Sequence, residues 1–260
     1  MTVITLTTDF GLRDPFVGVM KGVILGINRR VHLVDLSHNI APQDVLEGAL
    51  ALEAAVPFFP PGTIHLAVVD PGVGSLRRPL AVAARGQQFV GPDNGLFTFV
   101  FGEPGWRAVA LEVAASRLPE VSRTFHGRDL FAPAAASLSL GTPLERLGPP
   151  LADPVRLPWP GALWQEGALV GKVVHVDRFG NLITSIRAAD LEAFGRRESL
   201  AVEVQGREVG GVVGCYADVK SRSAAALLGS SNRLEIFVRE GSAQAETGAT
   251  REAEVVVRKR

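Results

Sequence analysis

Cysteine is almost absent from this chain, which has Cys215 as its single thiol among 260 residues. One cysteine cannot form a disulfide within the chain, and it cannot build a zinc site from thiolates. The histidines also lack the close pairing, such as His-x3-His, that metal sites use. We therefore predict no metal ion and a reducing compartment, the cytoplasm.

Net charge and long apolar runs are lacking too. Lys and Arg together number 27, and so do Asp and Glu, so no strong field draws the chain to nucleic acid or to an anionic membrane. No uncharged apolar run reaches the roughly 18 residues of a membrane span. The opening MTVITLTTDF carries no basic segment of the kind that starts a signal peptide. We expect a globular protein with neither nucleic acid nor membrane as its partner.

The first part of the chain alternates strand signals with helix signals. Short β-branched, apolar runs are typical of buried strands, and the segments between them show helical periodicity. A βαβαβ order predicts an α/β domain whose mainly parallel sheet is flanked by helices on both faces. The predicted strands cover residues 3–7, 31–36 and 64–69, and the predicted helices cover about 15–28 and 43–56.

A proline-rich stretch ends this rhythm. Residues 141–161 contain six prolines, too many for a helix or a central strand. Beyond them, short apolar runs alternate with Gly, Asn and Ser, which is typical of a small all-β barrel or sandwich. The sequence therefore predicts an α/β domain at 1–147, a linker at 148–162 and a smaller barrel-like domain at 163–260.

Two aspartates directly follow predicted strands. Asp9 lies in TDFG and Asp70 in DPGVG, and ligands of parallel sheets bind beyond the carboxyl ends of the strands. Each motif is also compatible with a plain turn, and Asp14 before Pro15 is a candidate helix cap. GPDNG at 91–95 is equally typical of a turn. The glycine spacings of phosphate loops and dinucleotide folds are absent.

HGRD, at residues 126–129, directly precedes a predicted helix. One capping side chain is enough for a helix start, and Asp129 suffices. Capping then leaves His126 and Arg128 unexplained, although a lone histidine is more often structural than catalytic. No Gly-x-Ser-x-Gly elbow of a serine hydrolase is present. We expect Asp129 or backbone donors to begin the helix while His126 faces a ligand.

DRFGNLITSI, from 177 to 186, lies between two predicted strands of the second domain. Phe179 offers a ring that can stack on a base, and Asn181 an amide that can bind a purine edge. The alternative is a hairpin turn with a buried phenylalanine.

Taken together and in this order, six motifs resemble one family: TDFG, FVGVMKG, DPGVG, GPDNG, TFHGRDLFAPAAA and VDRFGNLITSI. It is the S-adenosyl-L-methionine (SAM) hydroxide adenosyltransferase family, related to the SAM-dependent fluorinases and chlorinases. The similarity runs from about residue 3 to about residue 240. It implies hydrolysis of SAM by water to adenosine and L-methionine, without a cofactor. It also implies a homotrimer, with each site between the N-terminal domain of one subunit and the C-terminal domain of the next.

The resemblance also implies roles for individual residues. The catalytic set of the family falls on Asp70, Arg77 and His126. The implied substrate contacts are the ribose for Asp9, the reacting carbon for Phe125, the methionine amino group for Asp177, the adenine for Phe179 and Asn181, and the methionine end for Ser230 and Ser231. The halogenases have Ser-Arg where this chain reads Ser-Ser-Asn-Arg at 230–233, which leaves the carboxylate anchor open.

Two rival functions differ from hydrolysis in what they require. A SAM-dependent halogenase resembles this chain but has Tyr at the position of Asp70, and the fluorinase has a long insertion where only residues 75–90 stand here. A non-catalytic SAM or adenosine sensor needs Asp9, Phe179 and Asn181 but not the catalytic set. For hydrolysis, His126 is a candidate base for the attacking water. Asp70 is a candidate to orient the histidine or to accept the proton directly, and Arg77 to orient Asp70.

Overall fold

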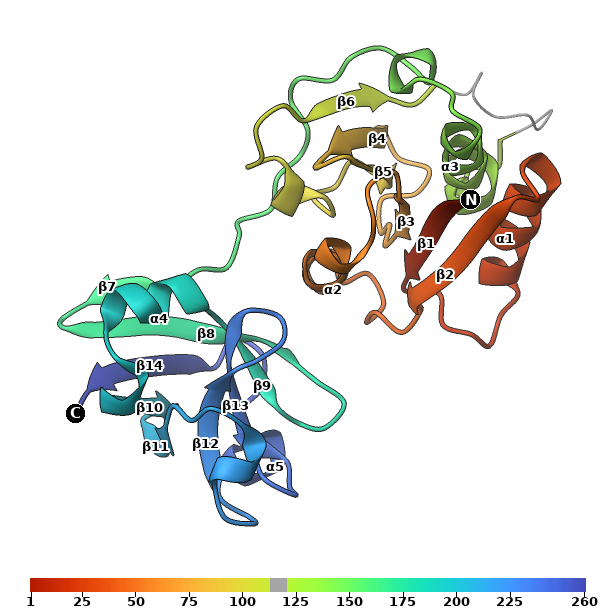
Figure 1. The fold of residues 1–260 in the computed structure, drawn as a ribbon. Coiled ribbons are helices and arrows are strands. Elements are labelled where there is room, and N and C mark those ends of the chain that lie inside the picture. The colour runs from red at the N-terminus through yellow and green to blue at the C-terminus, as the bar shows by residue number, and fades with distance from the viewer. Residues whose placement is uncertain (113–120) are drawn as a thin grey trace. The chain divides into compact units, whose positions relative to one another are not determined.

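The computed structural model describes residues 1–112 and 121–260, which form two compact units, Met1–Pro158 and Trp159–Arg260 (Figure 1). The stretch expected as a linker at 148–162 is packed on the first unit over its first part. Leu151 is buried there, and its N–H donates to the carbonyl of Ala108 at 2.8 Å. Pro150 forms an antiparallel bridge with Val109, and the N–H of Ala110 donates to the carbonyl of Pro149 at 3.0 Å, so residues 149–151 run along an edge of the first sheet.

The first unit is built on a six-stranded sheet in the order β2-β1-β3-β5-β4-β6. Both predicted helices and all three predicted strands are confirmed. Asp44 accepts a hydrogen bond from the N–H of Glu47 at 2.9 Å and caps the second helix. The elements are β1 (Thr2–Thr8), α1 (Phe16–Ile27), β2 (Val31–Ser37), α2 (Val45–Ala55), β3 (Ile64–Val68), β4 (Pro79–Ala84), β5 (Gln87–Pro92), β6 (Arg107–Ala110) and α3 (Ala132–Ser139).

This sheet is mixed, whereas the sequence predicted a mainly parallel one. Strands β2, β1, β3 and β5 are parallel to one another, but β4 runs antiparallel to both β5 and β6. The reason is a tight hairpin between β4 and β5. Its two turn residues, Arg85 and Gly86, have φ of 54° and 72°, the left-handed pair that a two-residue hairpin requires.

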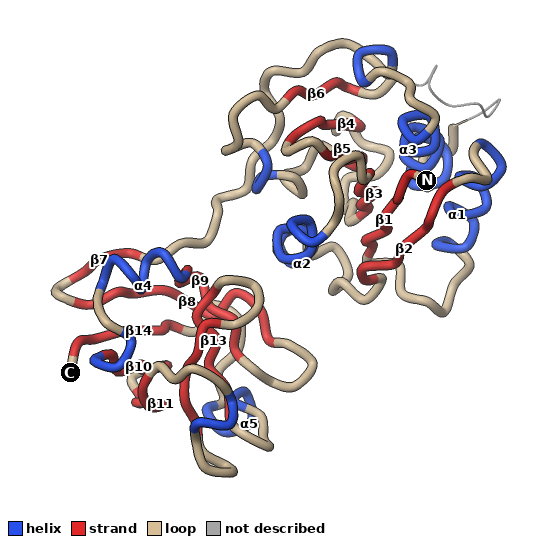
Figure 2. The backbone as a smooth tube through the Cα atoms, viewed as in Figure 1, coloured by secondary structure: helices blue, strands red, loops and turns tan. Residues whose placement is uncertain are grey.

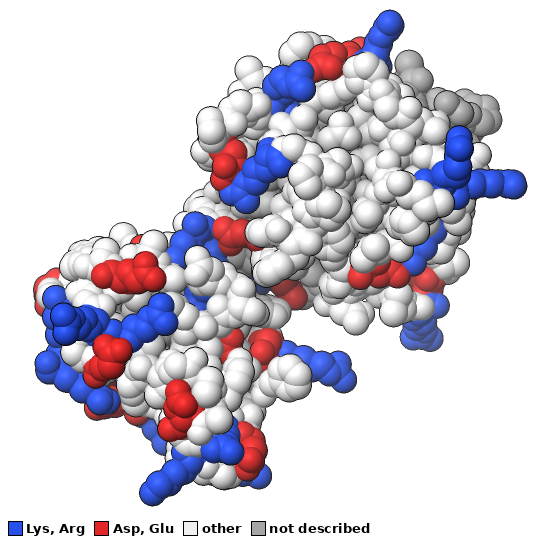
Figure 3. All heavy atoms as spheres, in the orientation of Figure 1, with Lys and Arg blue, Asp and Glu red and all other residues white. Residues whose placement is uncertain are grey.

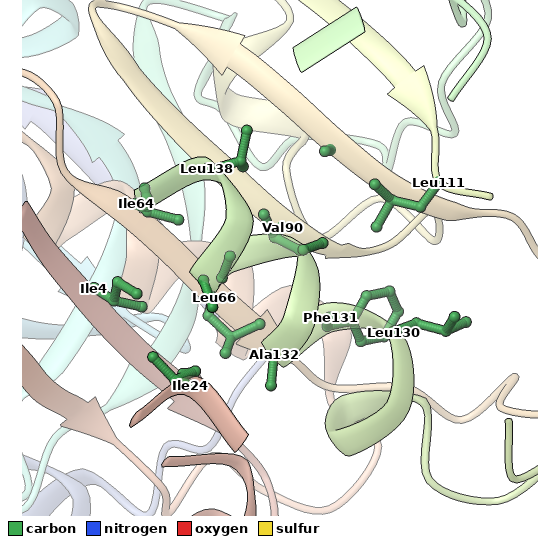
Figure 4. Close-up of a cluster of buried hydrophobic side chains, with 14 of the residues drawn as sticks. Ile4, Ile24, Ile64, Leu66, Val90, Leu111, Leu130, Phe131, Ala132 and Leu138 are labelled. Atoms are coloured by element: carbon green, nitrogen blue, oxygen red, sulfur yellow. The ribbon is translucent and has the colours of Figure 1, made fainter. Parts of the chain in front are cut away.

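Helices cover both faces of the sheet. Helices α1 and α3 pack on one face, where their apolar side chains meet Ile4, Leu66 and their neighbours (Figure 4). Helix α2 lies on the other face, where a Cβ on Gly48 would lie 3.0 Å from Val69 and from Leu96. Because helices cover both faces, a ligand can reach the sheet at the ends of its strands. In such sheets ligands bind beyond the carboxyl ends of the strands.

The second unit is a nearly closed antiparallel sheet, as the barrel-like prediction expected (Figure 2). Its order is β11-β10-β14-β8-β9-β13-β12, with β7 paired to β8, and a bridge from Val212 to Ala226 joins its ends. The elements are β7 (Leu163–Gln165), β8 (Ala168–Val176), β9 (Leu182–Arg187), α4 (Ala188–Phe194), β10 (Leu200–Val204), β11 (Arg207–Gly211), β12 (Ala224–Leu228), β13 (Arg233–Val238), α5 (Ala243–Thr247) and β14 (Glu254–Lys259).

The surface of each unit carries both signs of charge, and acidic and basic side chains are interspersed on the face in Figure 3. This matches the equal numbers of acidic and basic residues in the sequence. Within the part of the chain that the structure describes, no helix is long and apolar enough to cross a membrane.

Candidate functional site

Asp70 and Arg77 form a buried ion pair at the carboxyl end of β3. Nε of Arg77 donates to Oδ1 of Asp70 at 2.8 Å, and Nη2 donates to Oδ2. The two side chains are only 5% and 9% exposed. The end of the strand is fixed from the side, because the amide of Asn94 donates to the carbonyl of Val69 at 2.8 Å. The GPDNG turn therefore holds the residue that directly precedes Asp70.

The loop between these two residues requires glycine at one position. Gly74 has φ of 78°, and a Cβ built on it would lie 2.5 Å from the carbonyl oxygen of Arg123. A side chain here would push away the segment that leads to His126. The glycine of DPGVG thus allows two segments, far apart in sequence, to approach each other.

His126 completes a three-residue chain. Its Nδ1 lies 2.6 Å from Nη2 of Arg77. A guanidinium has only donors, so Nδ1 must offer its lone pair, and a neutral imidazole then carries its proton on Nε2. Burial, together with the positive charge of Arg77, lowers the pKa of His126 below its usual value. At neutral pH the structure therefore presents an Nε2–H donor.

One nitrogen of the Arg77 guanidinium makes no hydrogen bond to the described residues. Nη1 of Arg77 is buried and has no hydrogen-bond partner among the described residues. The guanidinium also lies over the ring of Phe131, 5.3 Å from its centroid, on the side of the protein core. A buried N–H without a partner is costly, so this atom is a candidate donor to a ligand.

Asp129 does not cap the helix with its side chain, contrary to one of the two expectations for HGRD. A π-helical turn over Gly127–Phe131 begins when the N–H groups of Arg128 and Asp129 donate to the carbonyl of Phe125, both at 3.2 Å. The buried carboxylate instead accepts the N–H of Ser122 at 2.7 Å and pairs with Arg128. Asp129 therefore holds the preceding loop in place, and backbone donors begin the helix.

Phe125 and Asp9 lie close to this chain of residues in the fold. The ring of Phe125 packs edge-to-face on Phe10 and Phe16, with centroids 6.1 and 5.3 Å away. Asp9 follows β1 as Asp70 follows β3, and the two strands are paired in parallel. Oδ2 of Asp9 accepts the N–H of Gln43 at 2.8 Å, whereas Oδ1 has no partner among the described residues.

In the second unit, Asp177 organises the predicted turn after β8. Oδ1 accepts the N–H groups of Phe179 and Asn181 at 2.8 and 2.9 Å, and Oδ2 accepts the side-chain amide of Asn181 at 3.0 Å. The turn agrees with the alternative interpretation of this motif, but the phenylalanine is not buried. Phe179 is 75% exposed, so its ring is accessible to a ligand.

Ser230 and Ser231 lie in the turn between β12 and β13. Below this turn, the carboxylate of Glu235 accepts a hydrogen bond from the hydroxyl of Tyr216 at 2.5 Å. Burial, and then the nearby charge of Asp177, raise the pKa of Glu235. Glu235 and Tyr216 were missed in the sequence, although a lone glutamate inside the apolar run RLEIFV is a usable signal.

Each unit thus gathers one half of the predicted site. The first unit brings together Asp70, Arg77 and His126, with Asp9 and Phe125 nearby, and the second unit carries Asp177, Phe179, Asn181, Ser230 and Ser231. Over residues 1–112 and 121–260, no three His, Cys, Asp or Glu side chains are grouped as they would be around a metal ion.

Two hydrolases are similar to nearly the whole chain, and a fluorinase is similar to about three quarters of it. A protein of Thermus thermophilus named (R)-S-adenosyl-L-methionine hydrolase is 45% identical over 93% of both chains. A hydrolase of the same name from Salinispora tropica is 38% identical over 95% of this chain and 94% of its own. A fluorinase of an Actinoplanes species is 33% identical over 74% of each.

Solved structures and family models agree with these relatives. A crystal structure from Thermotoga maritima has a TM-score of 0.91 at 34% identity, over 98% of this chain and 99% of its own. One from Thermus thermophilus has a TM-score of 0.79 at 41% identity, over 99% and 100%. The model of the SAM hydroxide adenosyltransferase N-terminal domain matches residues 4–148, and that of the C-terminal domain matches 171–256. The chain therefore belongs to the SAM hydroxide adenosyltransferase family.

Proposed function

We propose that this protein hydrolyses SAM to adenosine and L-methionine. The observation that carries the proposal is the hydrogen-bonded set Asp70–Arg77–His126, in which two donor nitrogens, Nη1 of Arg77 and Nε2 of His126, have no partner among the described residues. The relatives that match over more than nine-tenths of the chain are named hydrolases, and the fluorinase matches at lower identity over a shorter stretch. A halogenase does not require Asp70, and a sensor does not require any of the three residues Asp70, Arg77 and His126.

In the proposed reaction the oxygen of water attacks C5′ of the ribose. The C–O bond forms as the C5′–S bond breaks, the sulfur keeps the electron pair of that bond, and methionine leaves as a neutral thioether. The water loses one proton. A sulfonium leaves without acid assistance, so the weak nucleophile is the difficulty, because bulk water has a pKa of about 15.7.

We propose that His126 acts as a hydrogen-bond donor rather than as a base. Its Nδ1 lone pair is already occupied by Arg77, so Nε2–H is a donor to the attacking oxygen. Nη1 of Arg77 is a second donor. Two fixed donors stabilise the negative charge that develops on the oxygen as its proton departs. Asp70 is the one member of the chain with acceptor lone pairs left, and it takes the proton.

In this proposal the substrate contacts residues of both domains. Asp9 binds the ribose hydroxyls through its free Oδ1, and Phe125 lines the reacting carbon. Phe179 stacks on the adenine with its exposed ring, and Asn181 contacts the adenine edge. Asp177 binds the amino group, and Ser230 and Ser231 bind the methionine end. We place these halves, from the domains at 1–147 and 163–260, in neighbouring subunits of a homotrimer.

No cofactor takes part in this reaction, and the single cysteine fits a cytoplasmic enzyme. The relatives are named for the (R) form of SAM, so we extend that preference to this chain. The two forms are readily offered separately in an assay.

The test is incubation of the purified protein with each form of SAM in ¹⁸O-labelled water, with and without excess chloride. We expect adenosine labelled at the 5′ oxygen, from the (R) form, in equal yield with and without chloride. Chlorinated adenosine would assign the protein to the halogenases. Tight binding of SAM without any turnover would identify a sensor.

A further inference from the structure

A second polar chain lies behind Asp9 and is not part of the proposed reaction. The hydroxyl of Thr8 lies 2.9 Å from Nδ1 of His38, and Nε2 of His38 lies 2.9 Å from Oδ1 of Asp35. The latter approach is short but is not aligned as a hydrogen bond. Lys21 donates to Oδ2 of Asp35 at 2.6 Å. Thr8 and His38 are buried, at 0% and 4% exposure.

The proton positions in this chain follow from the donors around it. The hydroxyl of Thr8 accepts the N–H of Phe10 at 3.2 Å. Its own hydrogen is free to point at Nδ1 of His38, and Nδ1 carries a lone pair when the imidazole is protonated on Nε2. The proton of the neutral imidazole is on Nε2, next to the carboxylate of Asp35. This one tautomer accepts the hydroxyl of Thr8 and places an N–H beside the carboxylate of Asp35, although not in hydrogen-bond alignment.

His38 also holds the TDFG loop through its backbone. Its carbonyl accepts the N–H of Gly11 at 2.7 Å. Five residues later, the N–H of Gln43 binds the Asp9 carboxylate, and Gln43 adopts φ of 67°, an unfavourable value for a residue with a side chain. The loop of Asp9 is therefore held at three points. Thr8, which contacts His38, accepts the N–H of Phe10, the carbonyl of His38 accepts the N–H of Gly11, and the N–H of Gln43 donates to the Asp9 carboxylate.

From these contacts we infer that His38 and Thr8 are positioning residues for Asp9, and hence for the ribose of the substrate. The inference rests on the proposed function, because it concerns the same ribose site. Neither residue touches substrate. Their effect is to fix the turn, so that Oδ1 of Asp9 faces the ligand rather than the backbone of its own loop.

The same strand contains a matched control. The hydroxyl of Thr5 lies 2.8 Å from Nδ1 of His65, and both residues are fully buried. This Thr–His pair has the chemistry of the first pair but lies in the middle of β1 and β3, with no bond to the TDFG loop. A purely structural role predicts equal consequences for Thr5→Val and Thr8→Val.

The experiment compares Thr8→Val and Thr5→Val for unfolding by urea, for KM and kcat with SAM, and for adenosine binding by calorimetry. Both should lose similar stability. Thr8→Val should raise KM and the adenosine Kd about tenfold, with kcat within about threefold, since a misplaced Asp9 weakens ground state and transition state alike. Thr5→Val should leave all three constants within about twofold.

Two conservative variants make the result independent of a folding failure. Thr8→Ser keeps the hydroxyl, and His38→Asn offers an amide oxygen near the position of Nδ1, so both should stay near the wild-type KM while His38→Ala resembles Thr8→Val. Equal KM values for Thr8→Val and Thr5→Val, or for His38→Asn and His38→Ala, would overturn the inference. A wild-type protein that releases no adenosine from SAM counts against the proposed function instead, and adenosine Kd values across the series then decide the role of His38.

Discussion

Arg77 donates to Nδ1 of His126 at 2.6 Å, and this contact decides which nitrogen of the imidazole carries the proton. The sequence left open which catalytic residue acts on the water. With Nδ1 occupied, His126 offers a donor, and the same guanidinium holds both oxygens of Asp70. Arg77 is thus the centre of the site, and its planar fork is the feature to test first.

Arg77→Lys should lower kcat for SAM hydrolysis by at least about a hundredfold. A lysine is a point charge that cannot hold Asp70 at two oxygens and His126 at once. Loss of one oxyanion donor alone typically costs about 10²–10³-fold. Adenosine release measured by chromatography gives kcat. Arg107→Lys, at an exposed ion pair with Glu145, should change kcat less than about twofold. An active Arg77→Lys enzyme would contradict this assignment.

The pH profile of kcat/KM tests the protonation state of His126. The pKa of this residue is lowered, so the neutral form persists at neutral pH and is lost only as pH falls through the lowered pKa. We expect the acid limb of the profile to have its midpoint below about 6.5, the usual value for histidine. His126→Asn should lower kcat/KM by about a hundredfold, as loss of an oxyanion donor typically does, and should remove this limb. A limb centred above about pH 7 in the wild type would mean that the charged imidazole is stabilised instead.

Asp129→Ala should act on stability more than on turnover. The substitution removes a buried carboxylate that accepts the partly buried N–H of Ser122 and pairs with Arg128, which costs about 2 kcal/mol of unfolding free energy. Urea unfolding and kcat are measured together. His126→Ala is the converse variant, with a large loss of kcat and little loss of stability. If both variants only destabilise, the catalytic interpretation of HGRD is wrong.

Gly74→Ala tests whether close approach of two loops forms the site. The new Cβ would collide with the carbonyl of Arg123, so the loop of Asp70 and Arg77 must shift. We expect kcat to fall at least about tenfold, since small misplacements of reacting groups are costly. Gly105→Ala is the control, because φ is 74° there but nothing lies within 4 Å of a Cβ. It should cost about 1–2 kcal/mol of stability and leave kcat unchanged. Equal kcat in both variants would refute the role of this contact.

His65 makes the stability of the first unit depend on pH. Burial lowers the pKa of His65 to about 4. In the unfolded chain the residue becomes protonated as pH falls through about 6.5, whereas in the folded protein it stays neutral until about pH 4. The contribution is fully present above pH 6.5 and is lost as pH falls, by about 3 kcal/mol at pH 4. Urea unfolding of wild type and His65→Leu at about pH 7 and about pH 4.5 measures it. The variant should lose less stability on acidification, whereas His32→Gln, at an exposed position, should match the wild type.

The local pattern of the sequence was enough to predict several strands and helices, the family and the position of two site residues. Apolar runs and their spacing predicted β1, β2 and β3 and the helices between them, because burial of one face or of both dictates those periods. The order of the motifs predicted the family, and the strand ends predicted where Asp9 and Asp70 stand. The roles of the ten predicted site residues remain predictions.

Only the tertiary structure decided the contacts between distant segments. Arg77 and His126 are 49 positions apart, and their hydrogen bond depends on how β3 and α3 pack. The tertiary structure also assigned the carboxylate of Asp129 to Ser122 and left Phe179 exposed. Local sequence specifies the period of each segment and the turns it permits. The partner of a buried donor or acceptor is set by whichever segment the fold brings within about 3 Å, and periodicity holds no information about that.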